Sequence, residues 1–130
     1  MATQITFSES FTAGADLRWG EFVKLSASGE VVPCDAAGEA FVGVVSGGSY
    51  DQGETALIAM ALEVYVLCQD PDVEPGTLIK TDANGEAAVA DGSNDFTALA
   101  LDHGRAAGDA GEVAKIRAAL PIVAAESDQT

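Results

Sequence analysis

The sequence predicts an all-β domain, and three observations lead to that prediction. Glycine accounts for 14 of the 130 residues and aromatic residues for only 6%, which favours short strands and tight turns over helices. Between residues 113 and 120, apolar residues alternate with Lys115 and Arg117, as expected of a half-buried strand. The chain also resembles itself at a spacing of about 56 residues, which indicates a repeated unit.

The internal similarity sets the expected domain organisation. Residues 20–35 align with 76–91 and share Gly, Lys, Ala, Gly, Glu and Asp, and residues 53–62 align with 111–120. Two units that each bury one face should pack together. We therefore expect one β domain over residues 20–123, a small barrel or sandwich built from units at about 20–68 and 76–123.

Each expected unit contains the same elements in the same order. A glycine-led strand (20–25 or 76–81) leads through a turn into a return strand (30–33 or 86–89), and a short apolar strand follows (40–45 or 96–101). The turn of the second unit contains Asn84-Gly85, which predicts a type I′ hairpin. A glycine-rich loop then leads to a closing strand, and the longest apolar stretch, 56–68, should form one or two strands.

The segments outside the units are expected to be an extended N-terminal arm, residues 1–19, and a polar tail, residues 124–130. In the arm, Ile5, Phe7 and Phe11 alternate with polar residues, and Trp19 closes the segment. One interpretation is a first strand that pairs with its own domain. The other is an arm that adds to a neighbouring molecule, in which case these four aromatic and aliphatic side chains contact the partner.

The charge excludes two classes of partner. The chain has 21 acidic and 6 basic residues, a net charge of −15, and its basic residues form no stripe. Binding to nucleic acid or to an anionic membrane depends on clustered Lys and Arg, so neither is expected. The apolar stretch 56–68 contains Glu63 and is too short for a membrane-spanning helix. A solvated acidic surface that resists self-association explains the charge, and a basic partner or a halophilic source would explain it too.

The sequence contains no constellation typical of an enzyme, a metal site or a cofactor site. His103 is the only histidine, and no nucleophile motif or phosphate-binding loop is present. Cys34 and Cys68 lack the spacing of a zinc site and are expected to be buried thiols, or else a disulfide. Acidic residues at 70, 72 and 74 resemble the start of a calcium loop, but Thr81 stands where that motif requires Glu.

Three motifs carry a resemblance to a known family: G-E-F-V-K-L at 20–25, F-V-G-V-V at 41–45 and P-G-T-L-I-K at 75–80. The sequence resembles the head decoration, or capsid cement, proteins of tailed phages. The resemblance implies a β-rich homo-oligomer, often a trimer, that is made in the host cytoplasm and binds the major capsid protein on the outer surface of the virion. It implies no catalytic residues, and it carries over only the structural glycines Gly20, Gly43, Gly53, Gly76 and Gly111. The alternative is a non-catalytic surface adhesion or carbohydrate-binding β module.

Overall fold

The computed structural model describes residues 6–92, 95–105 and 113–122, and all regular secondary structure within these ranges is β-strand. The strands are short, as the glycine content predicts, except for β5, which contains the long apolar stretch. They are β1 (Thr6–Thr12), β2 (Phe22–Leu25), β3 (Val31–Pro33), β4 (Gly43–Ser46), β5 (Thr55–Leu67), β6 (Leu78–Thr81), β7 (Ala87–Val89), β8 (Thr97–Ala100) and β9 (Lys115–Ile122).

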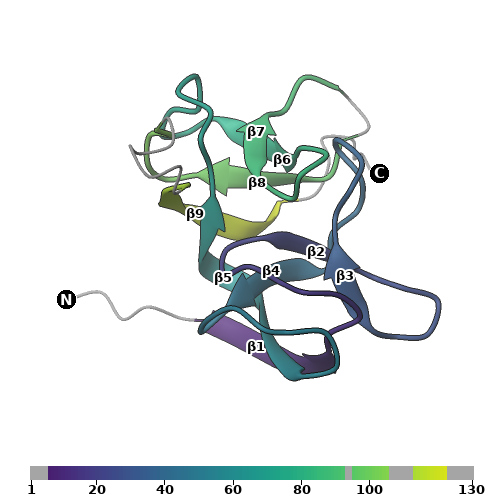
Figure 1. Ribbon diagram of the computed structural model, residues 1–130. Helices are drawn as coiled ribbons and strands as arrows, with labels where there is room; N and C mark the ends of the chain where they lie inside the picture. Colours follow the sequence, from purple (N-terminus) through teal and green to yellow (C-terminus); the bar gives the residue numbers. More distant parts are fainter. Residues whose placement is uncertain (1–5, 93–94, 106–112, 123–130) are drawn as a thin grey trace.

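The strands form one antiparallel sheet with the order β3-β2-β4-β5-β9-β8-β6-β7, and β1 pairs with β5 beside this path. The sheet curls into a half-barrel, with β1 to β4 at one end of the molecule and β6 to β8 at the other (Figure 1). Strand β5 runs from one end to the other and pairs with β9 in its second half. The all-β prediction is confirmed, and the predicted barrel takes the form of a single curled sheet.

The two ends of the sheet have the same strand pairing. At each end, a hairpin (β2-β3 or β6-β7) pairs through its first strand with a third strand (β4 or β8). Backbone hydrogen bonds recur at corresponding positions: Gly20 donates to Val45 at 2.9 Å, and Gly76 donates to Ala100 at 2.8 Å. The register is also the same at both ends. In the hairpins, Val23↔Pro33 corresponds to Ile79↔Val89, and Lys24↔Val32 corresponds to Lys80↔Ala88. Between the hairpin and the third strand, Phe22↔Val44 corresponds to Leu78↔Leu99.

The hairpin turn at Asn84-Gly85 differs from the predicted type I′ geometry. Gly85 has a φ of +76°, but no residue other than glycine has a positive φ among the described residues, so Asn84 is outside the left-handed region. The amide of Gly85 donates to the carbonyl of Asp82 at 3.2 Å, and a carboxylate oxygen of Asp82 accepts from the amide of Asn84 at 2.8 Å. The Asp82 side chain therefore stabilises a turn in which only the glycine needs a positive φ.

The predicted N-terminal arm is largely part of the fold. Residues 6–12 form β1, which pairs with residues 55–62 of β5 in the same chain. This segment is therefore a first strand of its own domain, which is one of the two interpretations that the sequence left open. Ala13 and Leu17 are buried, and Ala13 bridges to Val31 of β3. No free arm is seen in the part of the chain that is described. Ile5 and the predicted tail, 124–130, lie outside the described residues.

The buried apolar side chains form two clusters. One, which includes Leu17, Val23 and Ile58, fills the end that contains β1 to β4. The other joins the two ends because it combines Phe22 and Val44 with side chains from β6, β8 and β9. Burial of apolar surface between the ends is therefore the main force that holds them together.

Both cysteines are buried free thiols that belong to the cluster joining the two ends. Of the two possibilities that the sequence left open, the structure therefore has buried thiols. Burial raises the pKa of the Cys34 thiol to about 12, because the low-dielectric interior disfavours the thiolate.

Candidate functional site

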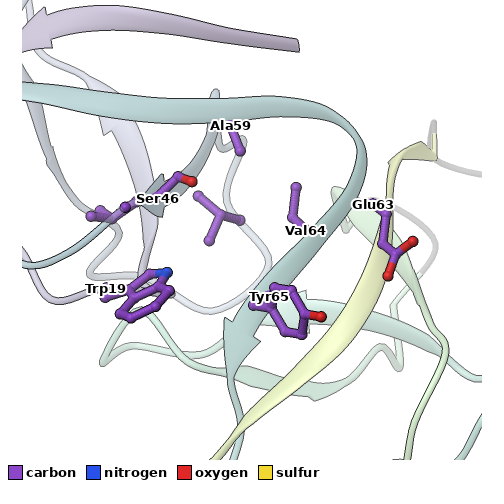
Figure 2. Close-up of a pocket in the computed structure, with 9 residues that line it drawn as sticks. Trp19, Ser46, Ala59, Glu63, Val64 and Tyr65 are labelled. Atoms are coloured by element: carbon purple, nitrogen blue, oxygen red, sulfur yellow. The ribbon is translucent and has the colours of Figure 1, made fainter. Parts of the chain in front are cut away.

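A hollow of about 320 Å³ lies on the surface between the segment before β2, strand β4 and strand β5. In Figure 2 the rings of Trp19 and Tyr65 flank one side of it, and Ala59 and Val64 lie opposite them. The remaining lining residues are Val44, Val45, Ser46, Gly47 and Glu63. The floor is thus apolar and the rim aromatic. The polar side chains of the lining are the hydroxyl of Ser46 and the carboxylate of Glu63.

Local structure explains why the two rings point outward. Along β5, Val64 and Val66 are buried, so the pleat turns Tyr65 to the surface, where 42% of it is exposed. Trp19, also 42% exposed, precedes Gly20, whose φ of +94° turns the chain toward β4. The amide of Trp19 donates to the hydroxyl of Ser49 at 3.2 Å, which helps to hold this segment in place.

Two of the six basic residues lie next to the hollow. The ammonium of Lys115 is 4.5 Å from the centroid of the Trp19 ring, a cation–π contact. Arg117 lies opposite Tyr65 in the β5-β9 register and forms an ion pair with Asp102 at 2.8 Å. Among the described residues, no carboxylate forms an ion pair with Lys115, whereas Arg18, Lys24, Lys80 and Arg117 each have at least one.

The pair formed by Arg117 and Asp102 predicts a measurable pH effect. Hydrogen bonds from Arg117 lower the pKa of Asp102 to about 2. Because the folded pKa lies below the unfolded value, the pair contributes stability above about pH 4, and this contribution is lost as the pH falls toward 2. We expect Asp102→Asn to lower the free energy of unfolding at pH 7 by less than about 1 kcal/mol, because the pair is partly exposed.

That difference between Asp102→Asn and the wild-type chain should shrink as the pH falls from 4 to 2. Denaturant unfolding of both proteins at several pH values between 7 and 2 measures it. If the difference in the free energy of unfolding stays constant down to pH 2, Arg117 does not lower the pKa of Asp102 in the folded chain.

A second, more open hollow lies where the two ends of the sheet meet, and an ionic network with two buried carboxylates lines it. The guanidinium of Arg18 forms ion pairs with Glu21 and Glu86, each at 3.1 Å, and donates to the carbonyl of Asn84 at 2.7 Å. Glu21 and Glu86 are only 5% and 4% exposed. Gln69 also donates to Glu86 at 3.0 Å. Because its acidic groups are engaged by Arg18 and Gln69, this network joins the ends of the sheet rather than presenting free groups.

The four residues predicted to contact a partner do not form one group. Trp19 lines the hollow. Phe11 is half-buried and packs against the apolar cluster at its own end of the sheet, and Phe7 is 62% exposed on β1 without lining the hollow. Ile5 lies outside the described residues. Sequence reasoning did not propose Tyr65 or Lys115, although the alternation within each strand does indicate that both face outward.

The other candidates for chemistry do not converge. His103 lies in the loop after β8, and the neighbouring Asp102 is paired with Arg117. In the acidic loop, the carboxylate of Asp70 accepts from the amide of Asp72 at 2.9 Å, as in a local turn. Within the described ranges, no group of three or more His, Cys, Asp or Glu side chains could hold a metal ion. The described ranges contain no helix that is long and apolar enough to cross a membrane.

Comparison with solved structures adds a decisive observation on the fold. The chain matches the N base of the head fiber protein gp8.5 in bacteriophage phi29, with a TM-score of 0.68, 16% sequence identity, and coverage of 94% of this chain and 99% of that chain. The two proteins share a fold. Neither a protein-family model nor a curated protein sequence matches the chain.

Proposed function

We propose that this chain is a structural protein of the phage head that attaches to the outer surface of the assembled capsid. The observation that carries the proposal is the shared fold with the phi29 head fiber N base over nearly the whole length of both chains. The sequence motifs at 20–25, 41–45 and 75–80 support the same class independently, because they resemble head decoration proteins.

The physical character of the chain suits a passive role. A protein that binds the assembled shell and not its separated subunits stabilises the shell by mass action, by about 2.7 kcal/mol per site when its concentration is a hundred times its dissociation constant. An acidic exterior, with a net charge of −15, keeps particles apart at low salt. Neither effect requires turnover or a cofactor, so we propose that the chain is not an enzyme.

We also infer that the two ends of the sheet are copies of one repeated unit. Beyond the matching registers, Lys24 pairs with Asp35 and Lys80 with Asp91, each at 2.7 Å. The loop that follows is stabilised in the same way in both copies, because the carboxylate of Glu39 or Asp95 accepts from two successive backbone amides. The paired lysines and aspartates, Lys24 with Asp35 and Lys80 with Asp91, are among the identical residues in the alignment of the two halves of the sequence.

A homo-oligomer, with a trimer favoured, completes the proposal. Three linked copies that engage equivalent sites gain avidity without new contacts. Strand β1 offers an edge for such an association, because the described strands pair with it on one side only. Phe7 on this strand is also 62% exposed, more than any other large hydrophobic side chain among the described residues. We propose that Ile5, Phe7 and Phe11 lie on or near the contact between subunits.

A binding experiment tests the proposed function. Purified chain is mixed with expanded heads of the phage that encodes it, prepared without this protein, and with an immobilised glycan panel. We expect saturable retention on heads and increased resistance of the heads to heat, with no retention on glycans. Retention on glycans alone would instead support the adhesion or carbohydrate-binding alternative, which the exposed Trp19 and Tyr65 rings favour.

A further inference from the structure

We propose that the face formed by Trp19, Tyr65, Lys115 and Arg117 is the surface that contacts the capsid, and that it receives an apolar side chain flanked by an acidic group. This inference rests on the proposed function and identifies the part of the molecule that carries it out. Its partner is one protein surface, the exterior of the assembled shell.

The first argument is the composition of the face. Trp, Tyr and Arg are the residue types that most often supply the binding energy of protein interfaces. Here the single tryptophan, a half-exposed tyrosine and an arginine come together from three separate segments. Both rings present a large apolar area with few rotatable bonds, so little conformational entropy is lost when a partner covers them.

The second argument is the shape of the face. The rings border a hollow of about 320 Å³, and its apolar lining includes Val44. Ala59 and Val64 lie across the hollow from the rings (Figure 2). A hollow of this kind accepts a projecting apolar side chain and removes it from water, which is how anchor residues bind. The second hollow, lined by Arg18, Glu21 and Glu86, has charged walls and cannot do the same.

The third argument is charge. In a chain of net charge −15, the ammonium of Lys115 has no ion-pair partner among the described carboxylates and lies against the Trp19 ring at the edge of the hollow. An acidic group on the partner, next to the apolar anchor, would pair with it. The carboxylate that lines the hollow, Glu63, forms an ion pair with Arg117 at 3.9 Å, so its charge is compensated. The complementarity is local, because the acidic surface elsewhere repels a broadly acidic partner and so disfavours docking in other orientations.

Substitutions on this face test the proposal with the binding assay described above. We expect Trp19→Ala and Tyr65→Ala each to weaken binding to heads by about 30-fold or more, the loss typical of an interface hot spot. Ser46→Phe should weaken binding similarly by filling the hollow, although it removes no partner contact. Lys115→Glu should weaken binding by about tenfold and Lys115→Arg should preserve it, because the charge is retained.

Two matched variants serve as controls. Leu25 and Phe96 are 48% and 44% exposed, close to the exposure of Trp19 and Tyr65, and lie outside the hollow. Their Ala variants should bind heads within about twofold of the wild-type chain. Thermal unfolding of every variant verifies that each is folded at the assay temperature.

The outcomes separate the two proposals. Undiminished binding of the folded Trp19, Tyr65 and Ser46 variants, or a greater loss in the Leu25 or Phe96 variants, contradicts this contact face while leaving the proposed function intact. A wild-type chain that does not bind heads contradicts both.

Discussion

Replacing Phe22 by Ala is expected to lower the free energy of unfolding by about 4 kcal/mol, the largest effect of any single change considered for this chain. Phe22 is fully buried in the cluster that joins the two ends of the sheet, and its ring centroid is 4.7 Å from that of Phe41. The substitution removes this burial and opens a cavity in the cluster, where Phe22 is the only fully buried aromatic side chain among the described residues.

The internal similarity provides a matched control at Leu78, which aligns with Phe22. The two residues occupy the same position in their strands, yet Leu78 is 39% exposed. We therefore expect Leu78→Ala to cost only about 1 kcal/mol. Urea denaturation followed by tryptophan fluorescence compares the two variants with the wild-type chain. Equal losses at the two positions would show that the two ends do not pack as described.

Replacing Arg18 by Met is expected to lower the free energy of unfolding by about 3 kcal/mol. The change leaves two nearly buried carboxylates, Glu21 and Glu86, without the guanidinium that pairs with both of them. The Arg18 side chain is 47% exposed, but the two carboxylates are not, and a desolvated charge that loses its partner is costly because nothing compensates it. Loss of the bond from Arg18 to the Asn84 carbonyl also weakens the junction between the two ends.

A combined variant distinguishes this explanation from a simple loss of packing. Adding Glu21→Gln and Glu86→Gln to Arg18→Met removes the unpaired charges, while each glutamine can still accept hydrogen bonds. We expect the triple variant to recover at least half of the lost stability in the same urea experiment. A triple variant no more stable than Arg18→Met would mean that the lost hydrogen bonds of the guanidinium, such as the one to the Asn84 carbonyl, rather than the unpaired carboxylates, account for the lower stability.

The strand positions could be predicted well because they follow from local patterns. Alternation of apolar and polar residues in β9 predicts that Lys115 and Arg117 face outward. The apolar residues that alternate with them are buried, namely Ile116, Ala118 and Leu120. The aligned Lys24 and Lys80 each form the same ion pair with the aligned aspartate. The sequence predicts the place of the turn at Asn84-Gly85 correctly but its type wrongly, because the Asp82 carboxylate accepts a hydrogen bond from the Asn84 amide and stabilises a different geometry.

The candidate site was predicted only in part, because its residues converge through pairing between distant segments. Trp19 was proposed from the sequence, but as the end of an arm that also contained Phe7 and Phe11. In the structure, β1 instead pairs with β5, and Trp19 lines the hollow together with Tyr65. Nothing in the sequence around Tyr65 marks it as a binding residue. The hollow between Trp19 and Tyr65 depends on the curl of the sheet, and no pattern within a single strand encodes that curl.

By itself, the sequence determined the all-β class, the places of the strands and the outward or inward direction of most side chains, because these depend on residues a few positions apart. Only the tertiary structure decided that aligned positions have different surroundings, with Phe22 buried and Leu78 half-exposed. It also decided that Trp19, Tyr65 and Lys115 share one face. The physical reason is that burial and proximity are set by which distant strands pair and how the sheet curls, and these are properties of the folded chain as a whole.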